Sequence, residues 1–496
     1  MREDIRKDIR GLSKEDQKSY LNTVANTYRN LADLLLKGDR ILEATQVLDL
    51  LKVQEFSEYV AKVNGNEQTA KGIELQTHEQ KIIALGNELS ALQKLDRDGK
   101  LDPAQQQRLT YLTSQERDRN QQFIAFIKSP EVQKQFREQN QNLGIEKFNR
   151  LNASLAQVQN AALFYPLILE DRLELILITA TTPPIRKTIN IKREVLNAAI
   201  MEFRANLQDP SSIDVKQDGK KFYNWLIKPF EAELQQAEVQ TIIYAPDGQL
   251  RYIPLAALYD GKQWLVEKYR INNYISNGLS FQHSKPLTNI RILAGAFGGK
   301  QREIRFGQAG LPSTLLEVSE IAKIIKNSTV LVENNFSRLA FVSKLSSYNI
   351  LHFATPFYFN RGKPEDSFML FGNGEKVTVS DFSNLDLSNV DLVVLSGSET
   401  GINSMFSNGV EILGLGYSLL NAGAKASISS LWKISDSGTQ LLMEAFYSNL
   451  QKGNTSIAAS LREAQLSMIR RPIKDGGVNY NHPYYWSAFV LIGNGL

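Results

Sequence analysis

The sequence predicts an α/β protein with a mostly parallel central sheet, preceded by an all-α helical arm. Up to about residue 160 the chain is helical in pattern and poor in proline and glycine, whereas beyond it apolar β-rich runs alternate with helical ones. Two of these runs, 349–355 and 389–396, are apolar enough for buried strands. The expected domains are a helical pair with a leading helix at 1–62, a helical hairpin or linker region at 63–160, and the α/β domain at 161–496.

The composition is that of an ordinary globular protein. The 496 residues are 42% hydrophobic and 22% charged, and the length allows more than one domain. No stretch is long and apolar enough to span a membrane. Residues 1–10 mix both charge signs and lack the apolar segment of a signal peptide. We therefore expect a cytoplasmic protein without a membrane partner.

Charge and metal-binding residue types exclude further classes of function. The net charge is only +4, and the densest basic cluster, Arg470–Lys474, is expected to be a solvated loop, so no nucleic-acid partner is predicted. The absence of cysteine excludes disulfides and thiolate metal sites. The histidines are too scattered for a zinc motif, and no metal or cofactor is expected. They are His78, His283, His352 and His482.

Residues 28–52 resemble a single helix-turn-helix of the tetratricopeptide kind. Ala32 and Ala44 are small enough to let two helices approach closely, and Gly38 is placed to form the turn. The usual apolar positions hold Leu35, Leu48 and Leu51. Because stacked repeats generally need about three units for stability, this pair either packs on neighbouring helices or remains from a longer array.

Residues 63–160 carry apolar residues at heptad-like spacing between charged faces. The apolar positions are Ile82, Leu85, Leu89 and Leu92. This pattern predicts an amphipathic helical hairpin packed on a core, with a partner-binding coiled coil as the alternative.

The α/β domain begins with a regular alternation of strands and helices. Strands are predicted at 173–181, 239–244 and 291–296, and helices at 192–207 and 219–237. Pro246, Asp247 and Gly248 predict a hairpin turn, since glycine tolerates positive φ there.

Two further local patterns have testable geometry. Thr314 and Glu317 have the spacing of a capping box that opens a helix over 315–325, followed by a strand at 330–333. The glycine-rich segment Phe297–Lys300 offers a possible phosphate cradle, but it lacks the ending and spacing of a P-loop, so a loose turn is predicted.

The two buried strands carry the most informative residues. The first reads Asn-Ile-Leu-His-Phe-Ala-Thr over 349–355 and ends on Pro356, and the second continues through Leu-Ser-Gly-Ser-Glu-Thr-Gly at 395–401. These segments resemble the catalytic strands of CHAT domains, the caspase-like module of bacterial peptidases related to caspases and separase. In that family the first strand closes with His-Gly after His-Phe-Ala-Thr, and the second closes with Ser-Ala-Cys-Glu-Thr-Gly.

The resemblance implies a caspase-like sandwich fold and a bacterial origin, and it continues through several separated motifs. These lie at 244–258, 411–416, 421–424, 427–432 and 482–489. It also places the family's general-base histidine on Pro356 and its nucleophilic cysteine on Ser398. Both residues of the catalytic dyad are therefore replaced.

These replacements argue against peptidase chemistry. A serine hydroxyl is a far weaker nucleophile than a thiolate and depends on an adjacent base, and proline has no titratable group. His352 lies four residues before Pro356, which along a strand is roughly 13 Å at about 3.3 Å per residue and beyond hydrogen-bond reach. We expect His352 to be a histidine within a buried strand.

The remaining candidate cleft residues are Phe357, Gly397, Glu399 and Thr400. Phe357 stands where the family has glycine, which suggests that the cleft is partly filled, and Gly397 stands where alanine is common. Glu399 and Thr400 match the family, and with Gly401 they are expected to shape the turn.

The expected function is that of a catalytically inactive caspase-like protein that acts through protein–protein interaction as a regulator, decoy or scaffold. Its partner would be a protein, such as a related CHAT peptidase or its substrate. The alternatives are an active peptidase or serine hydrolase that uses Ser398 with an unidentified base, or a peptidase whose cysteine was replaced by serine. The last of these would explain Ser398 but not Pro356.

Overall fold

A computed structural model describes most of the chain from residue 151 onward and part of the helical region before it. The described residues are 28–64, 92, 95, 101–112, 151, 153–158, 160–274, 287–300, 303–358, 367–378, 381–382, 385–399, 410–432, 434–453, 455–472 and 477–496. For 53–54, 56–64, 398–399, 410–413 and 436 the description covers the backbone only. The chain forms two compact units, one of Met1–Glu67 with Arg150–Leu496 and the other of Gln68–Asn149.

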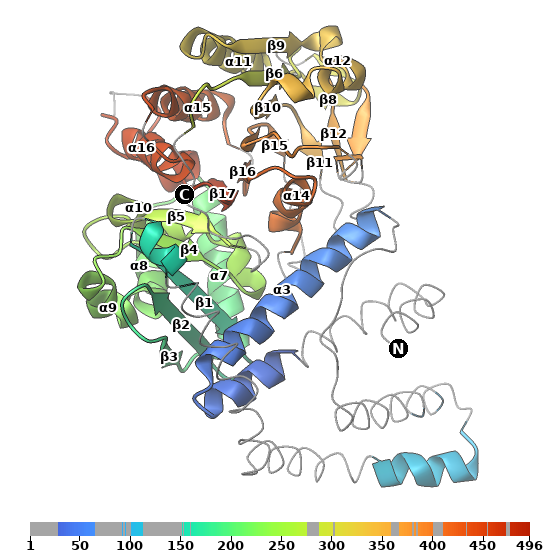
Figure 1. Cartoon of the computed structure of the whole chain (residues 1–496), viewed down its shortest axis with the longest axis vertical. Helices are drawn as coiled ribbons and strands as arrows, with labels where there is room; N and C mark the ends of the chain where they lie inside the picture. The colour runs from blue at the N-terminus through green and yellow to red at the C-terminus, as the bar shows by residue number, and fades with distance from the viewer. Residues whose placement is uncertain are drawn as a thin grey trace. The chain divides into compact units, whose positions relative to one another are not determined.

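The larger unit is built on an eleven-stranded sheet in the order β3-β2-β1-β4-β5-β17-β16-β14-β10-β6-β9 (Figure 1). Neighbouring strands are antiparallel at β3-β2, β2-β1 and β17-β16 and parallel elsewhere, so the prediction of a mostly parallel sheet is confirmed. The strands are β1 (Ala161–Ile168), β2 (Leu173–Thr179), β3 (Ile185–Ile189), β4 (Thr241–Tyr244), β5 (Arg270–Asn273), β6 (Ile292–Ala296), β9 (Ser328–Val332), β10 (Ile350–Ala354), β14 (Leu392–Leu395), β16 (Ala426–Ser430) and β17 (Phe489–Gly493).

Two small sheets accompany the large one. The four-stranded sheet has the order β13-β12-β11-β15, and the strands β7 and β8 form a separate two-stranded hairpin. Their bounds are β7 (Ile304–Arg305), β8 (Gln308–Ala309), β11 (Phe357–Tyr358), β12 (Phe368–Leu370), β13 (Lys376–Thr378) and β15 (Ser398–Glu399).

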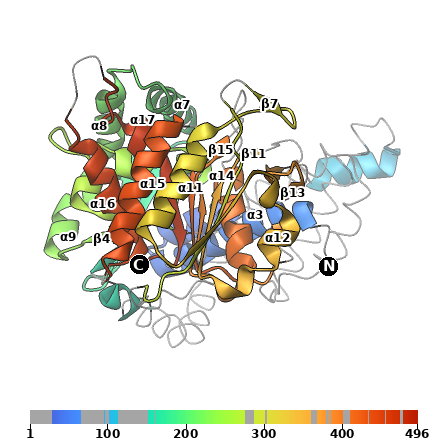
Figure 2. The same cartoon turned by 90° about the horizontal axis from the view of Figure 1, so that it is seen from above.

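Helices cover both faces of the large sheet. Figure 2 shows the strands between α11, α15 and α16 on one face and α3 and α14 on the other. The bounds are α3 (Ile41–Asn64), α7 (Arg193–Gln208), α8 (Val215–Leu226), α9 (Glu231–Gln236), α10 (Leu265–Lys268), α11 (Pro312–Ile324), α12 (Arg338–Val342), α14 (Val410–Asn421), α15 (Asp436–Gln451), α16 (Ile457–Ile469) and α17 (Pro483–Trp486). The central strands β10 and β14 are fully buried and, apart from His352, apolar, because helices bury both faces.

The joint between the two halves of the sheet lies at β5 and β17. Only Ile492 and Asn273 form a registered backbone pair there. Two amide side chains reinforce it: Asn272 Nδ2 donates to the Gly493 carbonyl at 2.8 Å, and Asn273 Nδ2 donates to the Leu491 carbonyl at 3.2 Å. These buried asparagines therefore supply hydrogen bonds that the short ladder lacks.

The helix-turn-helix predicted at 28–52 is present as a helix over 28–37 and α3. Ala32 and Ala44 are fully buried, and the three predicted leucines are buried as well. The turn differs in one detail, because the positive φ of 56° belongs to Asp39 and not to Gly38. Asparagine and aspartate tolerate this region better than other non-glycine residues.

Three local predictions were wrong. The helix expected at 219–237 begins earlier, at Val215, and breaks after Leu226, because Pro229 has no N–H to donate. Residues 246–248 form no hairpin but lead into a 3₁₀ helix over Gly248–Tyr252. Helix α11 begins at Pro312 without a capping box, since the Thr314 hydroxyl donates to the carbonyl of Phe297.

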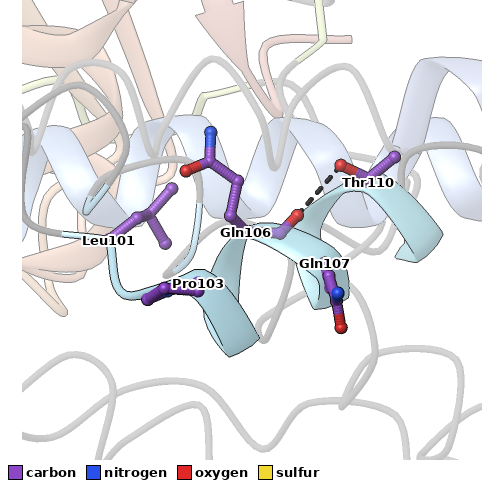
Figure 3. Close-up of a pocket in the computed structure, with 5 residues that line it drawn as sticks. All are labelled: Leu101, Pro103, Gln106, Gln107 and Thr110. Atoms are coloured by element: carbon purple, nitrogen blue, oxygen red, sulfur yellow. Dashed lines mark hydrogen bonds between the residues drawn. The ribbon is translucent and has the colours of Figure 1, made fainter.

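The smaller unit contains a described helix over residues 103–112. Leu92 packs with Leu101, Leu109 and Leu112, whereas Ile82, Leu85 and Leu89 lie outside the described residues. Beside this helix is a shallow hollow with amide and hydroxyl groups on its wall (Figure 3). Across the described parts of both units, no helix combines the length and hydropathy that a membrane crossing requires.

Candidate active site

Strands β10 and β14 lie side by side and parallel, as predicted. Ile350 pairs with Leu392 and Phe353 with Leu395, so both strands end at the same edge of the sheet. In open α/β sheets, ligands bind in the crevice at the carboxyl ends of such strands. The segments that follow β10 and β14 are therefore where a catalytic pair would belong.

The next residues of both segments pair with each other in the small sheet. Phe357 of β11 is in parallel register with Ser398 of β15, and Tyr358 is in register with Glu399. Pro356 immediately precedes this pair, and its carbonyl accepts from the Leu370 N–H at 3.1 Å. The backbone thus brings positions 356 and 398 together although they are far apart in sequence.

Gly397 allows the two segments to come this close. A Cβ atom at position 397 would lie 2.4 Å from the Thr355 carbonyl oxygen and 2.5 Å from the Thr355 nitrogen. Such distances are too short for any side chain, so glycine is required by backbone contact at this point.

Phe357 is buried, with only 2% of its surface exposed. An aromatic cluster lies on the same sheet edge, with Phe341 packed on Phe353 at 4.6 Å and Phe336 on Phe371 at 4.5 Å between ring centroids. A glycine at position 357 would leave open the volume that this ring fills.

His352 is fully buried in a network of polar side chains. Its Nε2 lies 2.9 Å from Glu317 Oε1 of α11 and 3.3 Å from Ser396 Oγ, and its Nδ1 lies 3.0 Å from Tyr447 Oη of α15. Burial raises the pKa of Tyr447 well above its usual value, and the nearby Glu317 adds to this effect. The network joins the sheet to both helices on this face.

The arrangement does not make His352 a base for Ser396. A carboxylate oxygen only accepts hydrogen bonds, so the shared Nε2 carries the hydrogen that is donated to Glu317. A general base needs a free lone pair toward the nucleophile and a carboxylate on the opposite ring nitrogen. Here one nitrogen faces both partners and the other faces a tyrosine, so the prediction of a structural histidine is consistent with the geometry.

The glycine-rich segment after β6 holds an internal carboxylate. The Gly299 N–H donates to Glu333 Oε1 at 2.8 Å, and Arg305 forms an ion pair with the same side chain. The N–H that would bind a phosphate is thus already used within the chain, which favours the turn over the phosphate cradle.

Sequence reasoning missed Glu317, Ser396 and Tyr447 as partners of His352. The available signal was the histidine itself, since a polar ring inside an apolar strand requires hydrogen-bond partners. Among the predicted cleft residues, Ser398 and Glu399 are described by backbone alone, and Thr400 lies outside the described residues. Within the described part of the chain, no group of three or more His, Cys, Asp or Glu residues is arranged to hold a metal ion.

The model of the CHAT domain family matches residues 216–494, which is more than half of the 496 residues. The chain belongs to the CHAT domain family. The matched region of this CHAT protein includes β10, β14 and the segments that carry Pro356 and Ser398. Strands β1, β2 and β3 precede the match but belong to the same sheet.

Known proteins with similarity to this CHAT protein include human tetratricopeptide repeat protein 28, which is 31% identical over 118 residues. That alignment covers 24% of this chain and only 4% of the human protein. Among solved structures, the Arg-specific cysteine proteinase gingipain R has a TM-score of 0.35 and 10% identity. The match covers 61% of this chain and 75% of the gingipain chain. The Saccharomyces cerevisiae separase–securin complex has a TM-score of 0.41 and 11% identity, and the match covers 70% of this chain and 31% of the chain in that structure.

Proposed function

We propose that this CHAT protein is a catalytically inactive pseudopeptidase that acts through protein–protein interaction as a regulator, decoy or scaffold. The register of Phe357 with Ser398 carries the proposal. The backbone apposition that a His–Cys dyad would need is present, while the residues at its two ends are proline and serine.

The chemistry of the neighbouring groups supports inactivity. Pro356 has no group that accepts a proton, and a serine hydroxyl without a base is a poor nucleophile. His352 is engaged by Glu317 and Tyr447 in the core. Phe357 fills space beside the site, where a substrate chain would need room.

The partner that we propose is a protein, such as a related CHAT peptidase or its substrate. The helical arm, meaning the helix over 28–37 together with α3, resembles a tetratricopeptide pair, which is a common peptide-binding architecture. One side of this arm is packed on the α/β domain through Asp49 and Lys52. A partner would therefore bind its outward side, where Asn30 is exposed.

The cysteine-free sequence permits a direct test of the site. We would compare Ser398→Cys alone with Pro356→His/Ser398→Cys, since the introduced cysteine is the single thiol in the chain. A neighbouring histidine lowers a thiol pKa and raises alkylation at neutral pH. The proposal expects rapid alkylation only in the double variant, and peptidase activity toward a substrate library only when Phe357→Gly is added to it.

Pro356→His combined with Ser396→Cys is the matched control, because it places the thiol just after β14, beside His352 and away from position 398. Equal alkylation of Ser398→Cys with and without Pro356→His would contradict the dyad geometry. Peptide turnover by the unmodified protein that is lost in Ser398→Ala would overturn inactivity and establish a serine hydrolase.

Binding is tested by presenting candidate partner proteins to the whole chain. Asn30→Glu, at an exposed position of the arm, should weaken capture, whereas the exposed control Lys323→Glu on α11 should not. Equal capture by both variants would move the binding surface away from the arm.

A further inference from the structure

Helix α3 carries three ionisable residues along one side. Asp49, Lys52 and Glu55 follow each other at intervals of three positions, which places them in a row on a helix surface. Such a row is normally solvated, but Asp49 is only 5% exposed and Lys52 only 4%. Both residues are thus buried against the rest of the unit.

Each member of the row has a partner in the α/β domain. Tyr165 Oη of β1 donates to Asp49 at 2.8 Å, and Lys52 Nζ donates to the Ala245 carbonyl at 2.6 Å while lying 4.6 Å from the centre of the Tyr165 ring. Arg251, whose side chain is fully buried, pairs with Glu55 at 2.5 Å.

Arg29, on the first helix of the arm, completes the set. It bridges Glu55 at 3.2 Å and Asp247 at 2.6 Å, and Asp247 also accepts from the Ile168 N–H at 2.9 Å. The cations Arg29, Lys52 and Arg251 thus balance the carboxylates Asp49, Glu55 and Asp247. We refer to these six residues as the α3 seat.

The α3 seat fixes the position of helix α3 more than it increases the free energy of unfolding. Burying ions costs desolvation energy, which good pairing offsets only in part, whereas removing one member leaves another without its partner. A shift of α3 by one residue along its axis would break every contact of the row. The seat is therefore selective for one register of this helix.

Burial has opposite effects on two members of the seat. It raises the pKa of Asp49 to about 7 and lowers the pKa of Lys52 to about 7, and in each case the attraction between the two residues opposes it. The groups that face this pair are Tyr165, Tyr274, Glu55, Asp247 and Arg251. The cost of burying both charges thus opposes their mutual attraction, which is consistent with a contact of limited strength.

The same helix also reaches the C-terminal half of the sheet. Helix α3 packs against α14, and the 3₁₀ helix that carries Arg251 packs against α14 as well (Figure 1). Helix α14 begins at Val410, soon after β15 ends at Glu399 along the chain. The seat therefore lies next to the helix that follows Ser398.

We propose that α3 is a releasable clasp, held in one register by the α3 seat, and that its seating fixes α14 and thereby the end of the segment that carries Ser398. This coupling links α3 to α14 within one chain and does not depend on the proposed pseudopeptidase function. It makes the arm a conformational control on the edge of the sheet where β10 and β14 end.

Hydrogen exchange of the full-length protein tests the clasp. In Lys52→Met, Asp49 loses its cationic partner, and amides of α3 and of residues 410–421 should exchange at least about tenfold faster, while β10 and β14 keep wild-type rates. In Asp49→Asn/Lys52→Met, where no buried charge of the pair remains, the rates should return toward wild type. Lys323→Met, which removes an exposed pair on α11, is the matched control.

Faster exchange of α3 with unchanged exchange over 410–421 would overturn the coupling to α14. Unchanged exchange of α3 in Lys52→Met would overturn the seat itself. If Lys52→Met fails to fold, Glu55→Gln is the second variant, because it keeps a hydrogen-bonding oxygen toward Arg251. The exchange rates of α3 and of residues 410–421 are measured in the same way, and a smaller increase in both is expected.

Discussion

Phe357 lies in parallel register with Ser398, so the residue that directly follows Pro356 in the chain pairs with Ser398 across the two segments. The pairing joins the backbones of the two segments that follow β10 and β14. This register also determines how substitutions in the two paired segments should affect activity and stability.

The purified protein should not hydrolyse peptides or proteins. Pro356 offers no base, and His352 is turned toward Glu317 and Tyr447. A general peptide library followed by mass spectrometry measures this directly. Cleavage that persists in Ser398→Ala would indicate a contaminating peptidase, whereas cleavage that disappears would contradict the prediction.

Ser398→Ala should leave stability nearly unchanged. A turn hydroxyl without a catalytic role contributes about 1 kcal/mol or less. Urea unfolding of both proteins gives the difference in the free energy of unfolding. A loss of several kcal/mol would reveal a buried network at this position and reopen the active-site interpretation.

His352→Ala should destabilise the protein by about 3 kcal/mol, because it leaves a cavity and removes a hydrogen-bond partner from buried Glu317 and Tyr447. His352→Leu/Glu317→Leu should cost less than the sum of the two single substitutions, since both ends of the contact are removed. Urea unfolding of the cycle checks this, and strict additivity would mean that the two side chains do not interact.

Gly397→Ala should cost about 1–3 kcal/mol, because the added Cβ would lie 2.4 Å from the Thr355 carbonyl and force the two segments apart. Gly38→Ala is a useful control, since its Cβ would approach nothing closer than 3.5 Å. The same thermal unfolding experiment serves both. Equal melting temperatures would show that the segments separate without cost.

The pH dependence of stability should change in Asp49→Asn. The folded-state pKa of Asp49 is raised from 3.8 to about 7, so its contribution is fully present below its unfolded pKa and is lost as pH rises through about 7. Lys52 acts in the opposite direction. Its folded-state pKa is lowered from 10.5 to about 7, so its contribution to stability is present above its unfolded pKa and is lost as pH falls through about 7.

Asparagine cannot ionise, so Asp49→Asn should gain stability relative to wild type between about pH 5 and about pH 7. Urea unfolding at both pH values measures the difference, with Lys323→Met as the reference for surface effects. A constant difference across this range would mean that Asp49 does not titrate there.

Continuous apolar runs of strand length were sufficient to predict both central strands, because that information is local, whereas the adjacency of the two strands was expected from the resemblance to CHAT domains. The sequence was not sufficient for Glu317 and Asp247. Both were assigned to local turns and caps, yet Glu317 bonds to a histidine 35 positions away and Asp247 to an arginine 218 positions away. Local spacing cannot show that a distant partner competes successfully for the same carboxylate.

The position of β17 between β5 and β16 has a consequence for biosynthesis. The strands on either side of it are made earlier, but they have no direct ladder to each other. The emerging chain can therefore form two separate half-sheets, and these become one only after residues 489–493 leave the ribosome. A nascent chain arrested before β17 would expose two open strand edges at once, which makes this stage of synthesis the one most dependent on chaperones.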